Sequence, residues 1–232
     1  PKGVADRYAK LTPNTWVRFS PPKRVDRCGW GTSAYDPERQ QILFWGGGHS
    51  EYTGTNVFHY SLRSNLWSLS SRPDWVLEWS GGFLCPATMS FRGRPHIPVH
   101  AYQCYAYDPV SDRMIAVKQE LTFTYDVVGR RWEGTPTKTP FHGHVMRISL
   151  ETTPLGVIAW AKQKRRDDHA DLFRWDNAKR QWLKLPMTGA KIAGPWCDGS
   201  GMCYDADRGC LWLAAHGRLF TYDLKSGEMS QV

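Results

Sequence analysis

The stretch QILFWGGGHSEYTG, residues 41–54, begins as a buried strand and ends as a polar hinge. Four large apolar side chains, Ile42 to Trp45, run directly into three glycines. A run that is apolar on both faces is typical of a strand covered on both sides by other layers. Glycine permits a positive φ and a close approach of the backbone, so the chain can turn sharply here. The turn carries His49 and Glu51 to one edge of the expected sheet.

Two-stranded units like this one recur along the chain. They read SAYDPERQQILFW, YAYDPVSDRMIAV and MCYDADRGCLWL, with ISLETTPLGVIAW as a weaker copy. Asp36 and Asp108 can accept hydrogen bonds from the backbone that follows them, and Pro37 and Pro109 preset φ for a type I turn. Each unit is therefore predicted to be a β-hairpin whose second strand is buried on both faces.

A second spacing repeats after each hairpin, because an aromatic residue is followed seven positions later by Trp or, once, by Met. The pairs are Tyr60 and Trp67, Tyr125 and Trp132, Trp175 and Trp182, and Tyr222 and Met229. Their first members lie 65, 50 and 47 residues apart. These segments read as two further, half-exposed strands, so each unit is expected to form one four-stranded antiparallel sheet.

Four-stranded sheets that repeat about every fifty residues are typical of a β-propeller. A β-sandwich with regular hairpins is the alternative, but it gives no reason for the repeated aromatic spacing. We therefore predict an all-β fold, a β-propeller built of four-stranded antiparallel blades, over a single domain 1–232. About four complete blades are expected at residues 30–70, 101–134, 144–186 and 198–231, with an orphan outer strand at 14–19.

The segment ILFWGGG followed by NVFHYSLRSNLW resembles a kelch repeat. Over residues 16 to 231 the chain resembles the kelch-like β-propellers of the galactose oxidase central domain type. Only the first unit has the double glycine; the later units carry Lys118-Gln119, Lys162-Gln163 and His216-Gly217 there. The resemblance also suggests a metal-dependent oxidase, which needs a Tyr cross-linked to Cys and two His ligands. That set does not map onto this chain, although Cys104 lies close to several tyrosines.

Four blades are few for a family in which six or seven are usual. Three explanations stay open: the chain is a piece of a longer propeller, two chains close one ring, or four blades suffice. The chain begins at Pro1 without an initiator Met, as a trimmed product would. An incomplete ring leaves apolar blade faces unpaired, so self-association is expected in that case.

The composition restricts the partners. The formal net charge is +8, and the basic residues are spread along the chain, which favours acidic partners such as an anionic carbohydrate. No phosphate-binding loop, dinucleotide fingerprint, nucleophile elbow or nucleic-acid module is present, so no nucleic acid is expected. No apolar stretch is long enough for a membrane span. Six cysteines without zinc-finger spacing suit disulfides in a secreted or periplasmic protein, or buried thiols.

Most histidines are predicted to gather on one face. In an up-and-down blade, the loop between the second and third strands and the connection to the next blade emerge on the same side. Seven of the eight histidines fall in these segments: His49, His96, His100, His142, His144, His169 and His216. Four of them, His100, His142, His144 and His216, could hold a divalent transition metal, zinc or copper. Polar loops without metal are the alternative.

The four units can also be aligned with one another on Tyr35, Tyr107, Leu150 and Tyr204, which gives further candidate residues for the same face. This alignment places Cys28, His100, Gly143 and Cys197 at equivalent positions, seven residues earlier in each unit. All four are expected to begin an innermost strand and to converge near the central channel.

A ligand site on this face would combine charged, aromatic and imidazole groups. The candidates are Trp30, His49, Glu51, Arg94, His100, Tyr102 and Arg165. Arginine binds carboxylate and sulfate through paired hydrogen bonds, which suits an anionic carbohydrate, and a loop face of this kind also suits a protein ligand. A His or Tyr beside Arg could instead remove the proton α to a uronate carboxylate, as a polysaccharide lyase does. A merely solvated basic rim is the remaining alternative.

Overall fold

The computed structural model describes residues 10–18, 21, 33–46, 54–72, 74, 90, 92–95, 101–196 and 199–232. Trp30, His49, Glu51 and His100 lie outside these residues. The described part is all-β and contains no helix, hence no helix that could cross a membrane.

The strands form four sheets, each built on four antiparallel strands that follow one another in chain order; the sheet of blade 4 has a fifth, parallel strand at its edge. Blade 1 consists of β1 (Ala34–Asp36), β2 (Gln41–Phe44), β3 (Phe58–Ser61) and β4 (Leu66–Leu69). Blade 2 consists of β5 (Tyr105–Asp108), β6 (Arg113–Lys118), β7 (Leu121–Asp126) and β8 (Arg131–Lys138). Blade 3 consists of β9 (Ile148–Thr153), β10 (Gly156–Ala161), β11 (Asp171–Asp176) and β12 (Gln181–Lys184). Blade 4 consists of β14 (Gly201–Asp205), β15 (Cys210–Ala215), β16 (Arg218–Asp223) and β17 (Glu228–Gln231), with β13 (Thr188–Gly189) parallel to β17.

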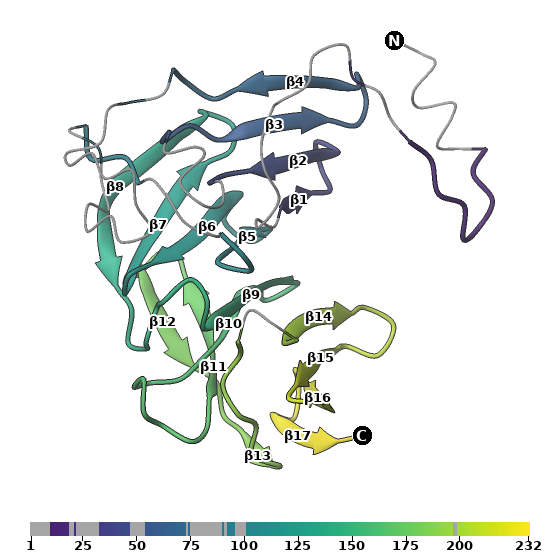
Figure 1. Ribbon diagram of the computed structural model, residues 1–232, viewed down its shortest axis with the longest axis vertical. Helices are drawn as coiled ribbons and strands as arrows, with labels where there is room; N and C mark the ends of the chain where they lie inside the picture. The colour runs from purple at the N-terminus through teal and green to yellow at the C-terminus, as the bar shows by residue number, and fades with distance from the viewer. Residues whose placement is uncertain are drawn as a thin grey trace.

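The predicted all-β propeller of four-stranded blades is confirmed. The innermost strands β1, β5, β9 and β14 follow one another around a common axis, and the outermost strands lie at the rim (Figure 1). In that view blade 1 extends upward from the axis and blade 4 downward, while blades 2 and 3 lie to the left. The four blades therefore form an arc on one side of the axis.

The repeated aromatic spacing corresponds to one transverse row in each blade. Its two residues are direct partners across the hairpin of the third and fourth strands, as in Tyr60 with Trp67 and Tyr125 with Trp132. The complete rows are Tyr35-Ile42-Tyr60-Trp67, Tyr107-Met114-Tyr125-Trp132, Thr152-Val157-Trp175-Trp182 and Tyr204-Leu211-Tyr222-Met229. We call the face that carries this row the front face of a blade, and the opposite face the back face.

Each front face packs on the back face of the blade before it. Trp132 on the front of blade 2 contacts Trp45 on the back of blade 1, with ring centroids 4.9 Å apart. Between blades 3 and 4, Ile158 shares a core with Leu211. As predicted, the second strands of the two middle blades, β6 and β10, are buried almost throughout. Strand β2 of blade 1 differs from the prediction: it alternates between buried and partly exposed residues, because no described blade covers its front face.

Three further local features differ from expectation. The third strands of blades 1 and 2, β3 and β7, are buried rather than half-exposed. Residues 14–18 form no strand: Asn14 has a φ of 63° in a turn, and Trp16 is 99% exposed. In blade 3 the hairpin turn is two residues shorter than in blade 2, so Thr152, and not Leu150, occupies the Tyr107 position. The residue seven positions earlier in blade 3, equivalent to His100 in blade 2, is therefore Val145 and not Gly143.

Candidate functional site

The connection between β8 and β9 presents two imidazole rings on one side. Along Phe141, His142, Gly143, His144 and Val145 the residues are alternately buried and more exposed. Alternation with a period of two is the property of an extended chain with one face on the protein. Phe141 anchors the buried face, with its ring centroid 4.8 Å from that of Phe173. The sequence His-Gly-His thus directs both imidazoles outward.

Gly143 allows this connection to lie directly on blade 2. A Cβ atom at this position would come within 2.9 Å of the Glu120 backbone and of the Val117 side chain. The close approach lets the N–H of Thr139 donate to the carbonyl of Glu120 at 2.8 Å. On the other side, the N–H of His142 donates to the carbonyl of Lys162 at 2.8 Å. The His-Gly-His segment is therefore held between the loops that follow β6 and β10.

The two imidazoles differ in their partners. The rings of His142 and His144 are nearly parallel, with centroids 6.1 Å apart. His142 Nδ1 lies 3.3 Å from a carboxylate oxygen of Glu120. His144 Nδ1 accepts a hydrogen bond from the N–H of Met146 at 3.3 Å, which leaves Nε2 as the protonated nitrogen of the neutral ring.

Burial lowers the pKa of His144, and the positive charges of His142, Arg147 and Arg165 lower it further. Neutral imidazole therefore predominates at His144 at pH 7.

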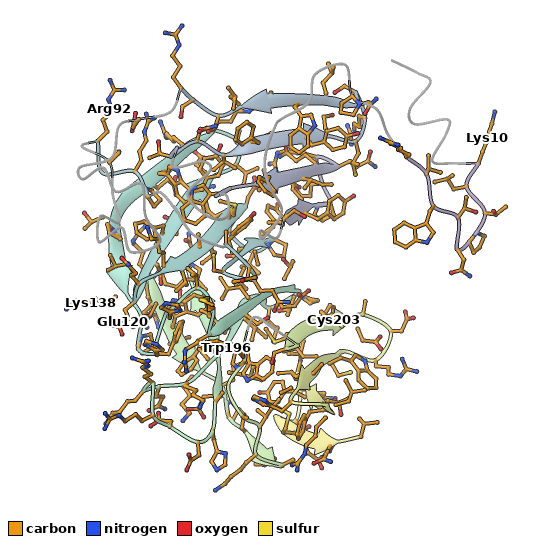
Figure 2. All side chains as sticks on the ribbon, in the orientation of Figure 1. Lys10, Arg92, Glu120, Lys138, Trp196 and Cys203 are labelled. Carbon is orange, nitrogen blue, oxygen red and sulfur yellow. The ribbon has the colours of Figure 1, made fainter. Side chains whose placement is uncertain are left out.

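Three further residues complete a basic and aromatic surface. The guanidinium of Arg147 lies over the ring of Trp196, 4.5 Å from its centroid, which is a cation–π contact. Arg165 is exposed in the loop between β10 and β11 and acts electrostatically on His144. We call His142, His144, Arg147, Arg165 and Trp196 the loop-face cluster. Figure 2 labels Trp196 and Glu120, both on the side of blades 2 and 3.

The loop-face cluster is suited to bind an anion that also carries an apolar or ring surface. Arg147 is positioned by its stacking on Trp196, so less side-chain freedom is lost when it donates hydrogen bonds to a carboxylate or sulfate. The Trp196 indole is partly exposed, and the part that Arg147 leaves uncovered can contact a sugar ring or an aromatic side chain. The Nε2–H of neutral His144 adds a further donor.

The structure brings together only part of the predicted set. His142 and His144 lie together, and Arg165 is close enough to affect His144. Arg94 instead pairs with Asp74, at 3.3 Å between Nε and a carboxylate oxygen, and donates to Ser71 at 3.1 Å. Its guanidinium thus holds the connection between blades 1 and 2. Tyr102 is partly buried just before β5.

The predicted metal site is not assembled among the described residues. His216 lies in the turn between β15 and β16 with a φ of 50°, and no contact in the described part of the chain joins it to His142 or His144. No group of three His, Cys, Asp or Glu side chains within the described ranges could hold a metal ion. Cys104, Cys203 and Cys210 form no disulfide.

Sequence reasoning missed two members of the loop-face cluster, Arg147 and Trp196, and also Glu120, which lies against His142. Arg147 lies three residues after His144, where a turn returns it to the same side. Glu120 has a φ of 63° in the tight turn between β6 and β7. A two-residue turn with positive φ at both residues was not recognisable from Gln119-Glu120, because glycine or asparagine usually marks such turns.

No model of a known protein family matches the chain, and no curated protein matches it.

Proposed function

We propose that the protein binds an anionic carbohydrate through the loop-face cluster. The observation that carries this proposal is the guanidinium of Arg147 stacked on Trp196, beside the imidazole of His144 and within electrostatic reach of Arg165. Planar cations and an indole on one surface match a sugar ring that bears a carboxylate or sulfate group. The formal net charge of +8 adds a long-range attraction for such a polymer.

We propose a kelch-like propeller of the galactose oxidase type as the architecture that carries this binding function. We also propose that the protein acts outside the cytoplasm, as a secreted or periplasmic protein. A protein ligand with acidic residues is the competing partner, since carboxylates of Asp and Glu suit the same guanidinium groups. The carbohydrate is favoured because Trp196 offers ring stacking beside the charges.

The binding test uses three polymers of different charge: polygalacturonate, chondroitin sulfate and neutral dextran. We expect the two anionic polymers to bind and dextran not to, with affinity that falls as salt is raised because the contacts are ionic. Arg147→Gln should weaken binding about tenfold, the effect of losing one charge-assisted contact of about 1.4 kcal/mol. Lys225→Gln, which removes the same charge from an exposed turn of blade 4, is the matched control and should leave binding unchanged.

Three results separate the possibilities. If Arg147→Gln and Lys225→Gln weakened polymer binding equally, the binding would depend only on the net charge of the protein, and the proposed site would be contradicted. Binding of an acidic peptide but of neither polysaccharide would transfer the function to a protein partner. Absence of binding to all of these ligands would refute the proposal.

An enzymatic alternative is favoured by one observation, the neutral imidazole of His144 beside two guanidinium groups. In a lyase, Arg neutralises the uronate carboxylate, a neutral base removes the adjacent proton, and the glycosidic oxygen on the next carbon departs. For His144 to be that base, its Nδ1 must first release the N–H of Met146, so that a free lone pair faces the substrate. Incubation with polygalacturonate should then generate the ultraviolet absorbance of an unsaturated product, and His144→Gln should abolish it. A flat absorbance trace with a bound polymer rejects the lyase and leaves the binding function.

A further inference from the structure

A cavity of about 380 Å³ lies at the propeller axis, apart from the loop-face cluster. The innermost strands of all four blades, β1, β5, β9 and β14, contribute to its wall, together with Ser33 and Gln103. Cavities of this size accommodate small molecules.

Glu151 stands out among the residues that line the axis. The corrected register of blade 3 places it opposite Ile158, in the row where blades 1, 2 and 4 carry Ala34, Ala106 and Cys203. The other three side chains are small, as the crowded axis requires. A carboxyl group in this row is not needed for the packing of a blade, since alanine serves twice.

Among the described residues of the cavity wall, Glu151 alone is charged. Burial raises its pKa to about 7, and hydrogen bonds from the backbone N–H groups of Tyr204 and Thr152 offset only part of this effect. The thiol of Cys203 on β14 is close enough to sense the Glu151 charge. Tyr35 and Tyr105 also border the cavity, and the Tyr105 hydroxyl accepts a hydrogen bond from the backbone N–H of Trp45. None of these neighbours supplies a positive charge at neutral pH.

Polar groups around Glu151 add directional hydrogen bonding. The Gln103 side-chain carbonyl accepts a hydrogen bond from the Ser149 hydroxyl at 2.5 Å, which orients the amide and leaves its NH₂ group as a donor. The NH₂ group lies 3.5 Å from the point that a Cβ of Gly201 would occupy, so it reaches across to blade 4. Tyr35 borders the cavity and is 47% exposed, so its side chain is accessible to a ligand.

We propose that this axial cavity is a second binding site, for a small polyhydroxylated ligand that carries a protonated amine. The ammonium group is placed at the Glu151 carboxylate, where it forms a charge-assisted hydrogen bond in a partly desolvated environment. Gln103 and Ser33 serve the hydroxyl groups, and the Tyr35 ring contributes a cation–π contact. The proposal is independent of the loop-face function, because no residue of the loop-face cluster lines the cavity.

Other ligand classes fit the cavity less well. An anion would be repelled by the Glu151 carboxylate, the one charge among the described wall residues. A metal ion needs three or four protein ligands, and no such group of His, Cys, Asp and Glu exists among the described residues. A neutral polyol could use the hydroxyl and amide groups but would leave the carboxylate uncompensated.

The test compares two probes that differ by one group, 1-amino-1-deoxysorbitol and sorbitol, by calorimetric titration near pH 8. We expect the amine to bind about ten times more tightly or better, as one charge-assisted contact provides. Near pH 5 the preference should shrink, because Glu151 is then protonated. Equal affinity of both probes, or binding of neither, would overturn the proposal.

Two variants locate the site. Glu151→Gln keeps the shape of the side chain and should abolish the preference for the amine. Glu151→Ala should do the same and should fold, because Ala34 and Ala106 occupy this row in two blades. Glu120→Gln removes a carboxylate on the loop face and should leave the preference intact. A preference that survives in both Glu151 variants, or disappears in Glu120→Gln, would place the amine elsewhere and refute the axial site.

Discussion

Glu151 lowers the stability of the folded protein at neutral and higher pH, although we propose that its carboxylate binds the ammonium group of the ligand. Its pKa is about 7 in the folded protein, against an ordinary value of 4.5. Between these values the folded state binds more protons than the unfolded state, so this group stabilises the fold at low pH and the contribution is lost as pH rises through 7. We predict that Glu151→Gln is more stable than the wild type at pH 8 by about 1 to 3 kcal/mol and equally stable near pH 4.

Chemical denaturation at a series of pH values measures this difference. Glu228→Gln, at an exposed position of β17, is the control and should follow the wild type at every pH. A Glu151→Gln variant that gains nothing at pH 8 would show that the carboxyl is solvated and that its pKa is ordinary.

His59 produces a pH effect of the opposite sign. It is buried between blades 1 and 2, with Nε2 2.7 Å from the Tyr125 hydroxyl and Nδ1 3.1 Å from the Gln41 side-chain oxygen. Burial, with a smaller contribution from the charge of Arg130, lowers its pKa to about 4. The unfolded state therefore binds more protons between pH 4 and 6.5, and the folded state loses stability as pH falls through this window.

We predict that His59→Gln removes this loss of stability. The difference in unfolding free energy between variant and wild type should shift in favour of the variant by about 2 to 3 kcal/mol from pH 7 to pH 4. Comparing the two proteins at each pH cancels the opposing contribution of Glu151. A difference that stays constant across the window would mean that His59 titrates normally.

The turn aspartates were predictable from the sequence, whereas Glu151 was not. Asp36 accepts hydrogen bonds from the N–H groups of Glu38 and Arg39, as the Asp-Pro signature indicated. Asp108 likewise accepts from Val110. In blade 3 no aspartate marks the turn, and the hairpin closes two residues earlier. An alignment by sequence spacing therefore misplaced the row in which Glu151 lies.

At the level of strands, the Trp of blade 2 and the Trp of blade 3 each join their blade to the one before it. The indole N–H of Trp132 donates to the carbonyl of Thr55 at 2.8 Å, and that of Trp182 to the Thr122 hydroxyl at 2.7 Å. Both bonds run from a front face to the blade before it. The spacing predicted the pairing within a hairpin correctly, but the contact between blades depends on how whole sheets pack, which spacing alone does not reveal.

We predict that Trp182→Phe lowers the free energy of unfolding by about 1 to 3 kcal/mol, because the Thr122 hydroxyl loses its partner and the smaller ring leaves a gap. Trp67→Phe is the matched control: it occupies the same row in blade 1 and is only half-buried, so its loss should be smaller. A double-mutant cycle with Thr122→Val isolates the bond between blades. Additive effects in that cycle would contradict a coupling between Trp182 and Thr122.

For the whole molecule, topology predicted more of the site than local sequence did. Up-and-down blades bring the loops after each second strand and between blades to one face, and this is why His142 lies against Glu120 and Lys162. The gathering of His142 and His144 with Arg165 could be foreseen on this basis. The cation–π pair of Arg147 and Trp196 could not, because it joins two connections whose paths no repeat determines.

The arc leaves a back face that no described blade covers. On blade 4, Cys203 and Ala214 are exposed and Leu219 is 40% exposed, whereas the corresponding faces of blades 1 to 3 receive the next blade. On the front face of blade 1, Tyr35 is 47% and Leu69 is 49% exposed. Within the chain, a back face packs on the front face of the next blade three times. The back face of blade 4 and the front face of blade 1 could pack in the same way between two copies of the chain.

We therefore predict that the chain self-associates through the back face of blade 4 in a concentration-dependent manner, measurable by sedimentation velocity. Ala214→Glu should shift the protein toward the monomer, because association would bury an unpaired carboxylate, at a cost of several kcal/mol. Val128→Glu introduces the same charge at a 64% exposed turn of blade 2 and should leave association unchanged. A wild type that sediments as a monomer at every concentration, or an equal response of both variants, would show that these faces do not pair between copies of the chain.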